Sequence, residues 1–372
     1  MTKKFTFLRL LLFAINTFAQ NTYVFFGSYN DNEVKEGIYV YQLDTVSGRL
    51  SKVTSVKVGN PSYLTLSPNE QFLYACTNTK TANEGSVSAY KFDPKKRKLN
   101  FINKQDSGGE NPVYVTVDAS GKWLVNANYT EASVSVHSLN EDGSIGRMTQ
   151  NIKYTDSSII PIRQAAAHIH AAVFAPDYKY IFFPDLGADK IRAYAFNVAN
   201  SQPLENISNP FIVTIPGSGP RHLTFHPNGK FAYCIEEMGG AVSAYNYLNG
   251  TLDRVQRVYT HPETLPKGSE SSDVQISPDG KFLYAANRGN ENNIAIFSIA
   301  ENGTLKLVGY QSAYGHHPRT LAIDPSGKFL ITTNVNSSNV IVFRRDAESG
   351  LLTKTGKAIK IDHVSCVKIQ RY

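Results

Sequence analysis

A short pattern recurs six times along this chain of 372 residues, and it constrains the fold more than any other feature. The pattern resembles x-P-x-x-x-x-x-x-P-[DNS]-G-K-F-L-Y, in which two mostly apolar runs flank a tight turn. Its copies cover residues 60–74, 111–125, 168–182, 219–233, 270–284 and 317–331, with some substitutions in each. Successive copies are 47 to 57 residues apart, a period typical of β-propeller blades.

Each copy predicts an antiparallel hairpin. In the copy at 219–233, two strand-like runs, 223–225 and 230–235, flank a Pro-Asn-Gly turn. A third strand-like run follows each hairpin, at 85–90, 132–136, 189–194, 240–245, 293–297 and 339–343. Another turn and a fourth strand come next, as at 249–252 and 301–305. Four short strands per repeat predict one propeller blade.

The two ends of the chain complement each other. Residues 22–28, 37–43 and 48–57 look like second, third and fourth strands without a first, whereas 363–369 looks like a first strand with nothing after it. We expect the C-terminal strand to join the N-terminal blade, which closes the ring without an open edge. The chain is therefore predicted to be an all-β, seven-bladed β-propeller of four-stranded antiparallel blades, formed as one domain by residues 20–372.

The N-terminus predicts export. Lys3 and Lys4 precede an apolar stretch at 5–15, and small residues end at Ala19. This arrangement is typical of a secretory signal peptide, here residues 1–19, and the stretch is too short to span a membrane comfortably. The mature protein is expected in the periplasm or outside the cell. Because no cysteine lies near the junction, we expect no membrane attachment after cleavage.

The charge and the cysteines narrow the possible partners. The net charge is +7, but Lys and Arg are spread along the chain, which favours a solvated surface and no nucleic-acid partner. Mild basicity also suits a small anionic substrate. Cys76, Cys234 and Cys366 each lie in a strand-like run and are expected to be buried thiols, with no disulfide framework or metal site. We expect a monomer.

Two positions of the repeat predict a functional site. The start of the first strand and the end of the second lie at the same rim of a blade, because these strands are antiparallel. Six residues before the turn these positions hold Ser62, Val113, His170, Arg221, Ser272 and Arg319, and ten residues after it they hold Asn78, Tyr129, Leu186, Glu237, Arg288 and Val335. A purely structural position should repeat one residue type. We therefore expect a site at one funnel mouth made by His170, Arg221, Glu237, Arg288 and Arg319.

This set suits an anionic substrate. Arginine forks bind carboxylate or phosphate and stabilise a developing oxyanion, while carboxylate and imidazole groups transfer protons near neutral pH. A structural alternative is that Arg221 simply forms an ion pair with Glu237. The spacing of His168 and His170, with Asp185 nearby, could suggest a metal site, but no third histidine accompanies them and none is predicted.

Other catalytic motifs are absent from the sequence. It contains no Gly-x-Ser-x-Gly elbow, no His-Glu-x-x-His, no P-loop and no dinucleotide-binding Gly-x-Gly-x-x-Gly. The Trp-Asp signature of WD40 scaffolds is also missing from the blades.

Four segments resemble a known family. Residues 168–177, 219–229, 233–237 and 273–288 look like the propeller-type lactonases, which include bacterial 6-phosphogluconolactonases and fungal carboxymuconate cyclases. The resemblance covers nearly the whole chain after the signal peptide. It implies a catalytic set of one His, two Arg and one Glu, which by motif are His170, Arg221, Glu237 and Arg288, four of the five residues that spacing selects.

The resemblance implies hydrolysis of a sugar lactone, such as 6-phosphogluconolactone or a related aldonolactone, without a cofactor. Arg221 and Arg288 would hold the anionic substrate, and Arg319, His168 and His222 are assigned further substrate contacts. Whether Glu237 or His170 is the base stays open, because burial decides their pKa values. Export departs from the cytoplasmic role of these lactonases and puts the phosphate in question. The alternatives are a muconate-type lactonising cycloisomerase and a non-catalytic exported propeller that binds carbohydrate or protein.

Overall fold

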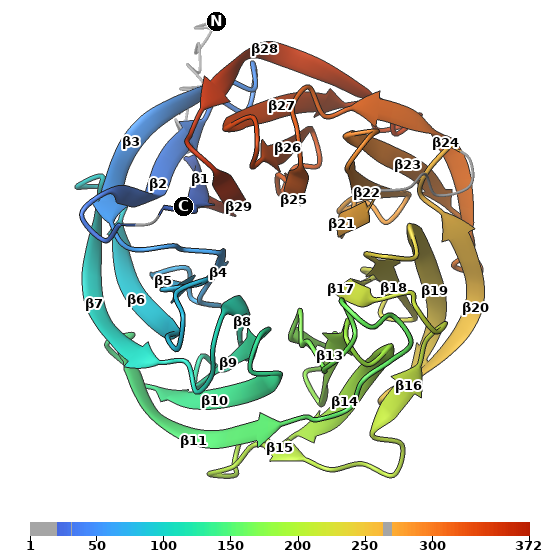
Figure 1. Cartoon of the computed structure of the whole chain (residues 1–372). Helices are drawn as coiled ribbons and strands as arrows, with labels where there is room; N and C mark the ends of the chain where they lie inside the picture. The colour runs from blue at the N-terminus through green and yellow to red at the C-terminus, as the bar shows by residue number, and fades with distance from the viewer. Residues whose placement is uncertain (1–20, 31, 263–269) are drawn as a thin grey trace, which may run out of the picture.

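The computed structural model describes residues 21–30, 32–262 and 270–372, and the regular elements of these residues are strands. They form seven antiparallel sheets arranged as blades around a central axis (Figure 1). This confirms the predicted seven-bladed β-propeller. The predicted signal peptide, residues 1–19, lies outside the described residues. Within the described ranges no helix has the length and apolar character needed to cross a membrane.

Both ends of the chain build blade 1. Its strand order is β29 (Val364–Arg371), β1 (Thr22–Ser28), β2 (Glu36–Leu43) and β3 (Leu50–Lys57). Strand β29 pairs antiparallel with β1, with Thr22 opposite Arg371 and Gly27 opposite Cys366. In Figure 1 the dark red β29 lies beside the blue β1. The ring is therefore closed by hydrogen bonds in the predicted way.

The other blades follow one another along the chain, from the innermost strand outward. Blade 2 contains β4 (Tyr63–Leu66), β5 (Phe72–Thr77), β6 (Ser86–Asp93) and β7 (Lys98–Asp106); blade 3 contains β8 (Pro112–Val117), β9 (Trp123–Asn128), β10 (Ser133–Leu139) and β11 (Ile145–Lys153). Blade 4 contains β12 (Val173–Phe174), β13 (Tyr180–Asp185) and β14 (Lys190–Phe196), with β15 (Leu204–Glu205) and β16 (Phe211–Val213) outermost. Blade 5 contains β17 (Pro220–Phe225), β18 (Phe231–Glu236), β19 (Ala241–Leu248) and β20 (Thr251–Tyr259); blade 6 contains β21 (Glu270–Ile276), β22 (Phe282–Arg288), β23 (Asn293–Ile299) and β24 (Leu305–Ser312); blade 7 contains β25 (Pro318–Ile323), β26 (Phe329–Asn334), β27 (Asn339–Arg345) and β28 (Leu352–Lys360).

Blade 4 departs from the regular pattern because its inner strand is interrupted. The carbonyl of Pro184 accepts a 2.9 Å hydrogen bond from the backbone N–H of His170, but proline has no N–H to donate back. Ile169 forms only an isolated bridge with Asp185, and β12 is reduced to two residues. The backbone around His170 is thus held by single contacts and not by a continuous ladder.

The repeated tyrosine of the sequence pattern joins neighbouring blades. Its hydroxyl donates to the carbonyl of a glycine in the outer turn of the next blade, in the pairs Tyr74 with Gly143, Tyr233 with Gly303, and Tyr284 with Gly350. These three hydrogen bonds are 2.8–3.1 Å long. The pattern therefore encodes contacts between blades as well as the hairpins within them.

The three cysteines are free and buried, as predicted. They lie in β5, β18 and β29, and burial raises the pKa of each thiol. These thiols are neutral packing groups.

Candidate active site

β-Bulges aim side chains into one mouth of the funnel. The register of the two inner strands shifts at Val113 in blade 3, at Arg221 in blade 5 and at Arg319 in blade 7. A bulge inserts one extra residue and redirects its side chain. In these three blades the sequence position six residues before the turn is thus the bulged residue at the rim.

A cavity of about 160 Å³ opens at this mouth, and we name it the front cavity. Its lining consists of Tyr29, Lys80, Asn111, Val113, Tyr129, His170, Glu237, Arg288 and Arg319. Four of the predicted site residues are therefore in the lining. The fifth, Arg221, lies behind Glu237 with its side chain fully buried.

Glu237 is the electrostatic centre of the site. Its Oε2 atom lies 2.8 Å from Nε of Arg221 and 2.7 Å from Nη2 of Arg288, and its Oε1 contacts Nη2 of Arg163. Burial alone would raise the pKa of this carboxyl, but the surrounding positive charges, with Arg288 foremost, bring the pKa well below its ordinary value. Glu237 is therefore ionised, and both of its carboxylate oxygens contact arginines.

His170 is buried beside this carboxylate and faces the front cavity. Burial lowers the pKa of its imidazole well below the ordinary value, and the charge of Arg221 lowers it further. Its Nδ1 atom has no hydrogen-bond partner among the described residues. The ring makes edge contacts with Tyr129 and His222, at centroid distances of 5.4 and 5.3 Å. A neutral imidazole can accept a proton.

Two further cations flank Tyr29 at the cavity rim. Nζ of Lys80 lies 4.0 Å from the centroid of this ring, and Cζ of Arg319 lies 5.4 Å from it. Within the described part of the chain, neither cation forms an ion pair with a carboxylate. Burial lowers the pKa of Lys80, and the charge of Arg319 adds to this effect. The rim thus offers positive charge to an anionic group.

His222 and Asp273 orient Arg221 from the side away from the front cavity. Nδ1 of His222 lies 2.7 Å from Oδ1 of Asp273, and its Nε2 lies 3.1 Å from Nη1 of Arg221. Burial and the nearby Arg221 lower the pKa of His222 to about 4, so the ring is neutral near pH 7 and can accept the arginine N–H. His222 does not line the front cavity, and its predicted substrate contact is not supported by this position.

His168 also lies outside the lining of the front cavity. Its ring stacks on Tyr129 at a centroid distance of 4.3 Å, and its Nδ1 lies 3.0 Å from the Tyr129 carbonyl oxygen. The backbone N–H of His168 donates to Asp185, which also pairs with Arg192. In this structure His168 therefore supports Tyr129, which does line the cavity.

Sequence reasoning missed Arg163. This residue lies between blades 3 and 4, in the longest interval of the repeat, and its side chain is about one-third exposed. It contacts Glu237 and lies 2.8 Å from Glu270, which also pairs with Arg288 at 3.1 Å. The extra length of this interval is the only sequence signal that could have pointed to it.

The residues of the front cavity combine a neutral proton acceptor, a buried carboxylate and the guanidinium groups of Arg288 and Arg319. This set can activate water and stabilise negative charge on an oxygen. Among the described residues, no group of three or more His, Cys, Asp or Glu side chains is arranged to hold a metal ion.

Comparison with known proteins agrees with this geometry. The family described as lactonase, 7-bladed beta-propeller, matches residues 23–369. A 6-phosphogluconolactonase from Formosa agariphila is 41% identical over 302 residues, which are 80% of this chain and 85% of that protein. A 6-phosphogluconolactonase from Bacillus subtilis is 35% identical over 76% of this chain and 80% of its own length.

A solved structure is also closely similar. The periplasmic gluconolactonase of Pseudomonas aeruginosa superposes with a TM-score of 0.89 at 32% identity, over 94% of this chain and 98% of that one. Sequence and structure thus agree over nearly all the described residues, and this chain belongs to the family of seven-bladed β-propeller lactonases.

Proposed function

We propose that this chain hydrolyses the internal ester of a sugar lactone, with 6-phosphogluconolactone or a related aldonolactone as substrate. The observation that carries this proposal is the placement of neutral His170 and ionised Glu237 in one cavity with Arg288 and Arg319. The family and the 6-phosphogluconolactonase relatives support the same reaction.

His170 is the proposed base. It accepts a proton from water while the water oxygen attacks the lactone carbonyl carbon, and the bond from that carbon to the ring oxygen then breaks. The same proton passes from His170 to the departing ring oxygen, which leaves a hydroxy acid. Glu237 is less suited to this role, because three arginines contact its carboxylate and hold its pKa low.

Arg288 is proposed to stabilise the oxyanion that forms on the carbonyl oxygen. It lines the cavity and is fixed by Glu237 at 2.7 Å and by Nε2 of His317 at 3.2 Å. Fixed donors stabilise developing charge without reorganisation during the reaction. Glu237 in turn holds Arg221 and Arg288 together, since without a counter-ion these two buried cations would repel each other.

Lys80 and Arg319 are proposed to bind a phosphate or carboxylate at the far end of the substrate. If they do, Arg319→Met should lower kcat/KM for 6-phosphogluconolactone about tenfold or more, and lower it much less for gluconolactone. The exposed Arg254→Met is the matched control. Equal losses for the two lactones would refute this assignment. Turnover of a carboxymuconate with neither lactone consumed would instead favour the cycloisomerase.

Residues 1–19 are proposed to be a signal peptide, and the mature enzyme is proposed to work in the periplasm or outside the cell. The basic start, the apolar stretch and the small residues before Gln20 support this, as does the similarity to a periplasmic gluconolactonase. N-terminal sequencing of the exported protein should begin near Gln20. An intact N-terminus in the cytoplasmic fraction would contradict export.

The enzyme is proposed to act as a monomer. The ring is closed within the chain, because β29 pairs with β1 and completes blade 1 without a strand from a second copy. Light scattering should give a mass close to that of one chain without its signal peptide, and a dimer mass would overturn this expectation.

A further inference from the structure

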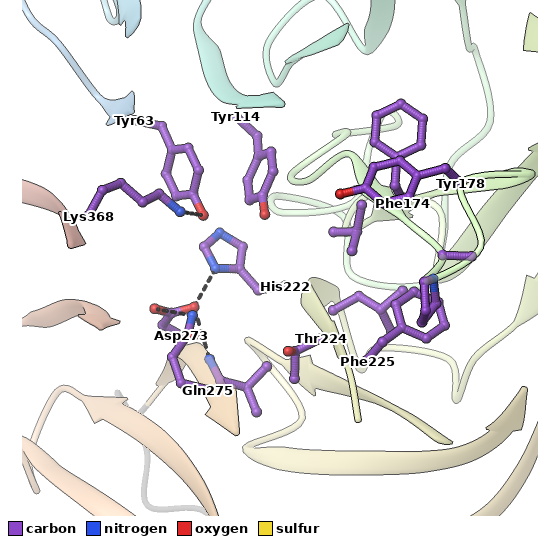
Figure 2. A pocket seen from close by; sticks show the side chains of 15 residues that line it. Tyr63, Tyr114, Phe174, Tyr178, His222, Thr224, Phe225, Asp273, Gln275 and Lys368 are labelled. Carbon is purple, nitrogen blue, oxygen red and sulfur yellow. Dashed lines mark hydrogen bonds and ion pairs between the residues drawn. The ribbon is translucent and has the colours of Figure 1, made fainter. Parts of the chain in front are cut away.

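A second cavity lies at the opposite mouth of the funnel, and we name it the rear pocket. Its volume is about 280 Å³, and no residue that lines it also lines the front cavity. Its lining comes from the inner strands of six blades and from the turn between β12 and β13, toward the end where β17 approaches its tight turn. Figure 2 shows its polar centre, formed by Tyr63, Tyr114, His222, Asp273, Gln275 and Lys368.

Lys368 brings a positive charge into this pocket. Its Nζ donates a 3.0 Å hydrogen bond to the hydroxyl of Tyr63, whose ring stacks on Tyr114 at 4.1 Å. Both tyrosine hydroxyls point toward His222 (Figure 2). In the described ranges, no carboxylate forms an ion pair with Lys368. The ammonium therefore keeps donors for a ligand.

Asp273 is the acidic group in the lining, and its oxygens are already occupied. Oδ1 accepts hydrogen bonds from Nδ1 of His222 at 2.7 Å and from the Val274 N–H at 2.9 Å. Oδ2 accepts the Leu321 N–H at 2.7 Å and lies 3.4 Å from the Gln275 amide nitrogen. The pocket is left with a surplus of donors, which suits a ligand that carries an anionic acceptor.

An aromatic wall faces these donors across the pocket. It consists of Phe174, Tyr178 and Phe225, and the first two rings lie 5.3 Å apart with a tilt of 31°. Figure 2 shows this wall on the side away from Lys368. A ligand that fills the pocket therefore meets a cation at one end and apolar ring faces at the other.

We propose that the rear pocket binds a small organic carboxylate with a flat, apolar body. The carboxylate accepts hydrogen bonds from Lys368 and the amide of Gln275, and the body packs on Phe174 and Phe225. Ligand atoms near His222 would lie on the far side of that ring from His170. The rear pocket shares no lining residue with the front cavity, so it can be tested by binding alone.

The test is calorimetric titration of the whole protein with benzoate. Wild type should bind one benzoate, and Lys368→Met should weaken this binding about tenfold or more, because one charge-assisted contact is lost. Benzyl alcohol, which has no charge, and acetate, which has no ring, should both bind at least tenfold more weakly than benzoate. Wild-type binding of benzoate no tighter than that of acetate would overturn the proposal.

Two controls locate the binding. The exposed Lys357→Met on β28 should bind benzoate like wild type, and so should Arg319→Met, which alters only the front cavity. Binding that survives Lys368→Met but is lost in Arg319→Met would place benzoate in the front cavity and overturn the proposal. If Lys368→Met fails to show the wild-type unfolding transition, Gln275→Leu supplies the same test, with at least a threefold loss expected and an unchanged affinity contradicting the site.

Discussion

The Nδ1 atom of His222 lies 2.7 Å from Oδ1 of Asp273, and this contact fixes which imidazole nitrogen faces Arg221. The Asp273 carboxylate can only accept, since the hydrogen bond from His222 helps to keep its pKa below the ordinary value although burial raises it. His222 must then carry its proton on Nδ1 and offer the Nε2 lone pair to Arg221 at 3.1 Å.

Asp273→Asn should disturb Arg221 without removing it. An asparagine amide can donate a hydrogen bond to Nδ1 of His222, and the imidazole proton then moves to Nε2. With its proton on Nε2, His222 can no longer accept the hydrogen bond from Arg221. We expect kcat/KM for lactone hydrolysis to fall about tenfold or more, mainly through kcat. The exposed Asp253→Asn on β20 is the matched control. A loss of thermal stability with unchanged kcat would show that Asp273 only joins the blades.

Glu237→Gln tests which group is the base. With His170 as base, kcat/KM of wild type should be steady near pH 7 and fall only at pH values well below 6.5, because His170 must be neutral and burial lowers its pKa well below that value. Glu237→Gln should reduce the rate about a hundredfold, because Arg221 and Arg288 lose the carboxylate that holds them. The variant should still show the fall in kcat/KM at acid pH, which we call the acid limb. Disappearance of that limb in Glu237→Gln would assign the base to the carboxylate.

Arg163→Met should weaken substrate binding more than chemistry. The partly exposed guanidinium pairs with Glu237 and Glu270 at the cavity edge, and the loss of this charge should raise KM about threefold to tenfold. Arg147→Met, at an exposed site on β11, should leave KM unchanged. Steady-state kinetics with gluconolactone separate the two constants. A large fall in kcat with constant KM would make Arg163 part of the reaction centre.

The outer-turn glycines should be sensitive to substitution where they meet an aromatic ring. Gly303 has φ +80°, and a Cβ there would lie 2.5 Å from Cδ1 of Phe231. Gly121 has a similar φ of +72° but no atom within 4 Å of such a Cβ. Both alanine variants incur about 1 kcal/mol of backbone strain, and Gly303→Ala should cost about 1–3 kcal/mol more. Equal free energies of unfolding in urea would contradict this contact.

His137 should make the fold sensitive to mild acid. Burial lowers the pKa of its ring to about 4 from 6.5, and neither ring nitrogen has a partner in the described residues. The unfolded chain therefore binds the proton first, and stability falls as pH decreases from about 6.5 to 4, by up to about 3 kcal/mol from this residue. His137→Phe should lose less stability over this range. Parallel curves of unfolding free energy against pH for variant and wild type would refute the assignment.

The sequence was sufficient for the ring because each blade repeats local signals. Turn residues such as Pro227 to Gly229 mark the hairpins, and the unpaired strand at 363–369 predicted the closure that β29 and β1 make. Blade 4 deviates because Pro184 removes one donor from the ladder. This is a local effect that the repeat alone does not reveal.

Sequence could predict site residues only at positions of the repeat where the residue type differs from blade to blade. Spacing brought His170, Glu237, Arg288 and Arg319 together, and the structure places all four in one cavity. Spacing also selected Arg221, whose side chain pairs with Glu237 and lies outside the cavity lining, at the register shift between Pro220 and His222. Arg163 lies in an interval outside the repeat, so no periodic position could indicate it.

Acid release from lactones is the most direct measurement of the central claim. Wild type should release acid from 6-phosphogluconolactone or gluconolactone well above the spontaneous rate, and His170→Gln should be about a hundredfold to ten-thousandfold slower while its unfolding transition stays close to that of wild type. Acid release by wild type at the spontaneous rate on both lactones, or equal rates for wild type and His170→Gln, would contradict the account.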